Sequence, residues 1–179
     1  MSELYHHGIK GQKWGKRNGP PYPLKDTANL NDVLREIKSI SYDDTSHGLK
    51  SPDKTLKDKS GNCHDQTFLI MNMLKSRGEN PKGFFVIEVD PKTGHGGMTH
   101  SFPYISKQNV YWIENAWNGN KGIHEFDSVQ SIKQYFDYKH KTGSFGNSSK
   151  YSELIFGNFN PDSISIGDSL QDIVDKCLS

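Results

Sequence analysis

The chain has 179 residues, of which 32% are hydrophobic and 11% aromatic, and its formal net charge at pH 7 is +1. This length indicates a single globular unit, and the balanced charge argues against a dedicated nucleic-acid or membrane surface, which needs a basic stripe. No apolar run is long enough for a transmembrane helix, and the N-terminus lacks the apolar core of a secretory signal, so we expect a protein of the reducing cytosol.

Residues 1–23 differ in composition from the rest of the chain. They are rich in glycine, proline and basic residues and show neither a helical nor a strand period, which predicts a flexible arm. Residues 24–179 are predicted to form the globular domain. The two cysteines, Cys63 and Cys177, are far apart in the sequence and make no disulfide framework.

The first helix is predicted to start at residue 27 or 29 and to run to about residue 40, because Leu30, Leu34 and Ile37 recur on one face. The polar, turn-rich stretch 41–59 is predicted to be a long surface loop.

A helix over about 62–77 follows. Asn62 is a suitable N-cap, and Asp65 stands three residues later, as in a capping box. Gly78 is a suitable residue just past the helix end.

The second half of the chain is dominated by strand patterns. Short, turn-forming connections join the first three predicted strands, which favours an antiparallel meander. The predicted strands are 83–89, 98–105, 110–117, 123–126 and 151–159, with helices beginning near 127 and over 167–178. The fold class is therefore α+β, with the helix over 62–77 packed on an antiparallel sheet.

The position of Cys63 at a helix start is chemically suggestive. Free N–H groups and the helix dipole favour a thiolate there, and a working nucleophile also needs a base held by a third group. His100 lies in one predicted strand and Glu114 and Asn115 in the next. Neighbouring strand residues point to opposite faces, so only one of the two can orient His100. We favour Glu114 because it shares a face with Trp112.

Each of these residues has an ordinary explanation when taken alone. A cysteine on a helix stripe is more often buried packing than a nucleophile. His64 follows Cys63 directly and points about 100° away on a helix, so we expect a surface or pocket residue and not the base. The joint order and spacing of Cys63, His100 and Glu114 nevertheless favour a catalytic triad.

These segments resemble the transglutaminase-like superfamily. The similarity covers roughly residues 55–130 and is carried by G-N-C-H-D, L-I-M-N-M-L-K-S-R-G, T-H-S-F and Y-W-I-E. It implies a papain-like core with Cys63 as nucleophile, His100 as base and Glu114 as orienting acid, where the family usually has Asp. Asn115 remains the alternative orienting residue.

The resemblance also implies an oxyanion hole, and no residue pattern in the sequence calls for a cofactor. The backbone N–H of Cys63 supplies one donor, and the second is expected from the 41–59 segment, Trp112 or Trp117. No metal is expected, because the Cys and His residues lack ligand spacing.

Residues 6–17, H-H-G-I-K-G-Q-K-W-G-K-R, resemble an N-terminal segment of tailed-phage and prophage structural or head-morphogenesis proteins. This implies a phage origin and a phage structural partner, with Trp14 as the anchor. A disordered leader is the alternative. The expected location is the host cytoplasm or the virion.

Together these patterns predict a phage-encoded cysteine enzyme that attacks an amide or thioester carbonyl of a protein or peptide. Transfer of the acyl group to water, as in a peptidase or deamidase, is favoured over amine cross-linking. The alternative is a non-catalytic phage accessory or virion protein that binds a partner through its N-terminal arm.

Overall fold

The computed structural model describes residues 27–45 and 47–178. The predicted arm at residues 1–23, with the predicted anchor Trp14, lies outside the described residues. Within the described ranges the α-helices are α1 (Ala28–Ile37), α2 (Pro52–Asp58), α3 (Cys63–Ser76), α4 (Val129–Lys141) and α5 (Leu170–Leu178). The strands are β1 (Ser41–Tyr42), β2 (Ser60–Gly61), β3 (Lys82–Val89), β4 (Gly96–Ser106), β5 (Val110–Glu114), β6 (Gly122–Phe126) and β7 (Glu153–Phe159).

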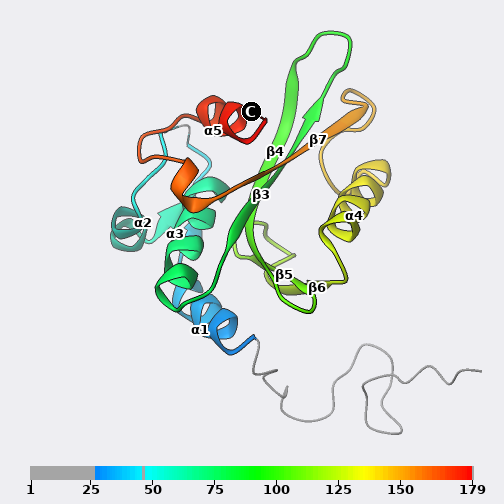
Figure 1. The fold of residues 1–179 in the computed structure, drawn as a ribbon. Helices are drawn as coiled ribbons and strands as arrows, with labels where there is room; N and C mark the ends of the chain where they lie inside the picture. Colours follow the sequence, from blue (N-terminus) through cyan, green and yellow to red (C-terminus); the bar gives the residue numbers. More distant parts are fainter. Residues whose placement is uncertain (1–26, 46, 179) are drawn as a thin grey trace, which may run out of the picture.

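The main sheet is antiparallel and has the strand order β6-β5-β4-β3-β7. Strands β3 to β6 form the expected meander, and β7 returns to pair with the outer edge of β3 (Figure 1). β4 pairs with β3 along most of its length, but β5 pairs with β4 only over Tyr104–Ser106. The half of β4 that contains His100 therefore has a strand neighbour on one side only.

One face of the sheet is covered by α4. Alternate residues of the strands point to this face, among them Phe102 and Trp112, and they pack against Phe136 of α4. Rings of this cluster lie at stacking distances, such as 4.2 Å between the centroids of Phe102 and Trp112. This aromatic layer keeps the α4 face of the sheet rigid, because aromatic pairs are among the largest apolar contacts available.

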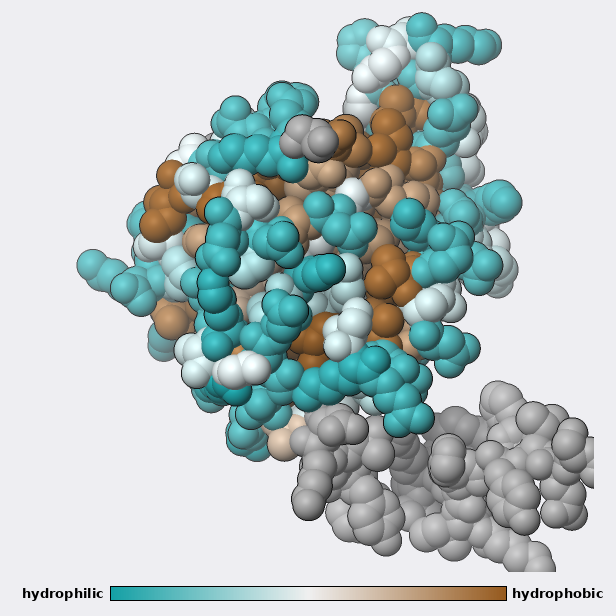
Figure 2. Space-filling model, in the orientation of Figure 1, coloured by the Kyte–Doolittle hydropathy of each residue, from teal (hydrophilic) through white to brown (hydrophobic). Residues whose placement is uncertain are grey.

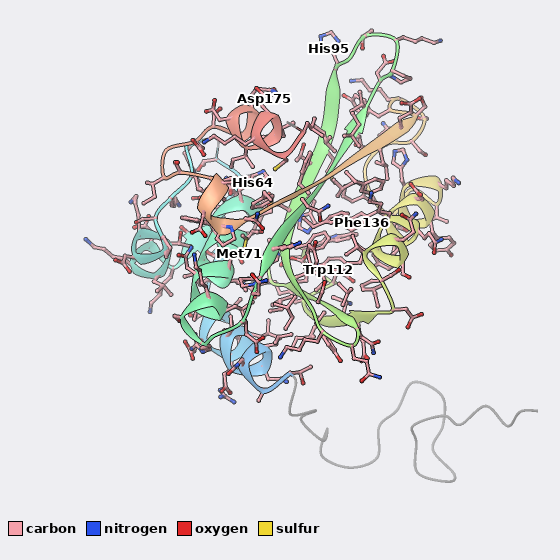
Figure 3. The ribbon with its side chains drawn as sticks, in the orientation of Figure 1. His64, Met71, His95, Trp112, Phe136 and Asp175 are labelled. Atoms are coloured by element: carbon pink, nitrogen blue, oxygen red, sulfur yellow. The ribbon has the colours of Figure 1, made fainter. Side chains whose placement is uncertain are left out.

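The opposite face is covered by α1, α3 and α5. The intervening strand residues, including Phe85, Ile105 and Ile113, pack against these helices. Figure 3 shows Met71 of α3 on this side of the strands and Phe136 and Trp112 on the other. Helix α3 thus lies directly on the sheet, with its first residue, Cys63, beside β4.

Most predicted elements are confirmed, but the predicted surface loop over 41–59 is wrong. This stretch contains β1 and the helix α2, and β1 pairs in parallel with β2. Ser51 caps α2 by accepting the N–H of Lys54 at 3.2 Å, and Pro52 occupies the first helical turn. Ser followed by Pro is a helix-start signal. The loop was predicted from the polar composition of the segment, which does not reveal this signal.

No helix among the described residues is both long and apolar enough to cross a bilayer.

We expect Phe136→Ala to lower the free energy of unfolding by about 3–5 kcal/mol, because it removes a fully buried ring. Tyr138→Ala, on the same helix but 65% exposed, is the matched control and should change it by less than about 0.5 kcal/mol. Urea unfolding followed by circular dichroism measures both. Equal effects of the two substitutions would contradict the assigned core.

Candidate active site

The first turn of α3 is fixed by the predicted capping box. The side chain of Asn62 accepts the N–H groups of His64 and Asp65, both at 3.0 Å, and the Asp65 carboxylate accepts the N–H of Asn62 at 3.0 Å. Gln66 donates its backbone N–H to the Asn62 carbonyl. The backbone N–H of Cys63 has no acceptor among the described residues, so it remains available to a ligand.

The helix start is also tied to the 41–61 segment. The second oxygen of the buried Asp65 carboxylate accepts the backbone N–H of Lys50 at 2.8 Å. The amide of Gln66 donates to the carbonyl of Gly61 at 2.8 Å and to that of Ser41 at 3.3 Å. The Asp65 carboxylate therefore serves both the cap and the neighbouring segment, and the position of Cys63 depends on it.

His100 and Glu114 form a buried, hydrogen-bonded pair. The Nε2 atom of His100 lies 2.7 Å from Oε2 of Glu114. The other oxygen of Glu114 accepts the backbone N–H groups of Ala116 at 2.7 Å and Trp117 at 2.8 Å. The carboxylate is thereby locked in place. With Nε2 engaged by Glu114, Nδ1 is the ring nitrogen left for Cys63.

Asn115 takes no part in this pair. Its side chain points to the α1 and α3 side of the sheet, where its NH₂ group donates to Oε1 of Gln66 at 2.6 Å and to the carbonyl of Ile37 at 3.3 Å. The expected opposition of neighbouring strand residues is confirmed. Of the two candidates, the structure brings only Glu114 to His100.

The thiol of Cys63 lies beside the ring of His100, and the two groups shift each other's pKa. Burial alone would raise the pKa of Cys63, but the charge of His64 and hydrogen bonds to His100 and His64 lower it well below the ordinary 9.0. Burial alone would lower the pKa of His100, but the charge of Glu114 and hydrogen bonds to Cys63 and Glu114 raise it to about 10. Both directions favour a thiolate beside an imidazolium.

His64 is closer to the chemistry than its helical position suggested. It is buried, borders the same cleft as Cys63, and its charge lowers the pKa of the Cys63 thiol. The hydroxyl of Thr67 donates its hydrogen to the carbonyl of Cys63 at 2.6 Å, so it can only accept from the hydroxyl of Ser101 at 3.2 Å. The Ser101 hydroxyl, having donated its own hydrogen, accepts from Nδ1 of His64 at 3.0 Å. This series of hydrogen bonds requires a proton on Nδ1 of His64. Nε2 is therefore the ring nitrogen whose protonation can change. Sequence spacing alone did not reveal this contact.

Cys63 opens onto a cleft of about 480 Å³. One wall comes from the 42–49 segment and the other from the start of α5 and the outer part of β4, including Tyr42, Leu170 and Thr99. Figure 2 shows hydrophobic surface where the β3–β4 hairpin meets the C-terminal helix, in a region otherwise rimmed by hydrophilic side chains. Cys63 itself is buried, with 4% of its surface exposed, and lies at the wall of this cleft.

The two tryptophans proposed as oxyanion donors lie elsewhere. The Trp112 side chain is fully buried in the aromatic layer, and its indole nitrogen has no hydrogen-bond partner among the described residues. Trp117 contacts the His100 ring edge-on, with centroids 5.7 Å apart. Neither borders the cleft at Cys63, whereas the 41–59 segment, the third predicted source, does.

The second cysteine is chemically different from the first. Both cysteines are free thiols. Cys177 on α5 is half-buried among apolar side chains, and burial raises its pKa to about 11. Within the described ranges, no group of three or more His, Cys, Asp or Glu side chains is arranged to hold a metal ion.

No model of a known protein family matches this chain, and no curated protein sequence matches it either. The function is therefore inferred from the geometry of the site.

At about pH 6, iodoacetamide should label Cys63 faster than free cysteine, whose pKa is about 8.5, because the neighbouring imidazoles lower the pKa of Cys63. Cys177 is the internal control and should react slowest. His100→Ala should slow labelling of Cys63 at least about tenfold, the factor for one pKa unit. Labelling no faster than free cysteine, and unaffected by His100→Ala, would contradict the assigned site.

Proposed function

We propose that this protein is a cysteine-dependent acyl-transfer enzyme with a transglutaminase-like, papain-like core. One observation carries the proposal. Cys63, at the N-terminus of a helix, lies beside His100, and His100 is held at 2.7 Å by a carboxylate that two backbone N–H groups fix in place. A nucleophile, a base and a group that orients the base are the three parts that covalent acyl transfer requires.

In the proposed first step, His100 already holds the proton of the thiol, and the thiolate Sγ of Cys63 attacks the carbonyl carbon of the substrate. A tetrahedral intermediate forms, and its carbonyl oxygen carries the negative charge. His100 then donates its proton to the leaving amine as the C–N bond breaks. The product is a thioester between the acyl group and Cys63, and Glu114 stabilises the charged imidazole throughout.

In the second step, an acceptor attacks the thioester while His100 removes its proton, and the thiol is regenerated. Water as acceptor makes the enzyme a peptidase, deamidase or amidase, and an amine makes it a cross-linking transferase. We favour water, because compact proteins with this resemblance are often hydrolytic. The substrate is a protein or peptide that reaches Cys63 through the open cleft.

The order of the catalytic groups supports the resemblance to transglutaminase-like domains. The nucleophile starts a helix, the base lies on β4 and the acid ends β5. Glutamate in place of the usual aspartate is accommodated, because Glu114 reaches His100 while its second oxygen is bound by the chain that follows β5. Phage origin and a phage partner rest on residues 6–17 alone.

A non-catalytic accessory or virion protein is the competing proposal. Such a protein has no need for a buried carboxylate that orients a histidine toward a free thiol. The hydrogen-bonded set at Cys63 therefore favours the enzyme.

The proposal is tested with p-nitrophenyl acetate as acyl donor. Intact-mass and peptide analysis should find an acetyl group on Cys63, and Cys63→Ala should abolish it. His100→Ala should slow acetylation by about 10²–10⁴-fold, the usual contribution of a general base, and Glu114→Gln should also slow it. The rate should level off well below pH 9.0, because the lowered pKa of Cys63 keeps the thiolate populated there.

His95→Ala is the matched control. His95 is exposed at the tip of the β3–β4 hairpin (Figure 3) and should not affect acetylation. Acetylation that occurs equally in the Cys63→Ala protein would refute the proposed chemistry.

A further inference from the structure

The short strand β1 holds Tyr42 beside the nucleophile. β1 and β2 pair in parallel, with Tyr42 opposite Gly61, two residues before Cys63. The backbone N–H of Asp43 donates to the carbonyl of Gly61 at 3.2 Å, and Gln66 binds the carbonyls on both strands. A side chain at residue 61 would collide with Asp65 at 2.8 Å, so glycine permits this close approach. Tyr42 is thus fixed relative to the first turn of α3.

The side chain of Tyr42 reaches the thiol from the cleft side. Tyr42 and Cys63 line the same cleft, and the Tyr42 hydroxyl is near enough to the thiol for the charge of Cys63 to raise the pKa of Tyr42, while the side chain remains 46% exposed. Partial burial, followed by the charges of Cys63 and Asp44, raises the pKa of Tyr42 to about 12. The hydroxyl therefore keeps its proton at neutral pH and can act as a hydrogen-bond donor.

Two neighbouring side-chain donors, those of Gln66 and Trp112, are committed elsewhere. The amide nitrogen of Gln66 already donates to two carbonyls, and its oxygen accepts from Asn115. Trp112 is enclosed in the aromatic layer. Tyr42 and His64 line the cleft together with Cys63, and both interact electrostatically with its thiol.

We propose that Tyr42 is a catalytic residue that supplies the second donor of the oxyanion hole, together with the backbone N–H of Cys63. When Sγ bonds to the carbonyl carbon, the carbonyl oxygen comes within hydrogen-bonding reach of a donor that previously contacted Sγ. The Tyr42 O–H then donates to the negative oxygen, and it returns to the sulfur after the C–N bond breaks and the carbonyl re-forms. No proton is transferred from Tyr42, so the step needs no further reactant.

This inference rests on the proposed acyl-transfer function, and the test separates the two. Acetylation of Cys63 by p-nitrophenyl acetate passes through an oxyanion, whereas alkylation by iodoacetamide does not. Tyr42→Phe should therefore slow acetylation by about 10²–10³-fold, the usual loss for one oxyanion donor. Alkylation, measured at a pH where the thiolate is fully formed, should stay within about twofold of wild type. The exposed Tyr42 ring keeps its shape in this variant, so folding should be preserved.

Tyr138→Phe is the matched control, because Tyr138 lies exposed on α4, on the other side of the sheet. It should leave both rates unchanged. Equal losses of acetylation and alkylation in Tyr42→Phe would overturn the inference and reduce Tyr42 to a residue that positions the thiol. Unchanged acetylation in Tyr42→Phe, with a large loss in His64→Gln, would assign the donor to His64 instead. A wild-type protein that alkylates but never acetylates would refute the acyl-transfer proposal itself.

Discussion

The site depends on one buried carboxylate, that of Glu114. One of its oxygens holds His100 at 2.7 Å, and the other is held by two backbone N–H groups of the chain that follows β5. A buried carboxylate without partners would be neutralised or expelled; here both oxygens have hydrogen-bond partners, and the charge of Glu114 raises the pKa of His100. The charged imidazole in turn favours the thiolate of Cys63, because an imidazolium beside a thiol lowers the pKa of the thiol.

The sheet and helix bring these groups together from opposite faces. His100 and Glu114 lie on the α4 face, where the aromatic layer supports them, while α3 packs on the other face. Contact is possible because β5 leaves the edge of β4 free at His100, so the first turn of α3 can meet that edge.

The local parts of this arrangement were predictable from sequence. Asn62 and Asp65 predict the start of α3. Alternation along β5 correctly predicts that Glu114 and Asn115 point to opposite faces of the sheet. Features that depend on pairing between strands far apart in the sequence were not predictable. No sequence pattern indicates that β7 pairs with β3. Tyr42 approaches Cys63 only because β1 pairs with β2. His64 was set aside because helical spacing turns it from Cys63, yet the hydroxyl of Ser101 on β4 holds its ring near the thiol.

The central claim is that His100 is a charged imidazole held between Glu114 and Cys63. The most direct measurement is a nitrogen-15 NMR titration of the His100 ring, assigned by the loss of its signals in His100→Ala. The account predicts that both ring nitrogens stay protonated through neutral pH and that the proton is lost near about pH 10. A ring that titrates near its ordinary value of 6.5 would contradict the account, because it would show that neither the carboxylate nor the thiolate stabilises the imidazolium.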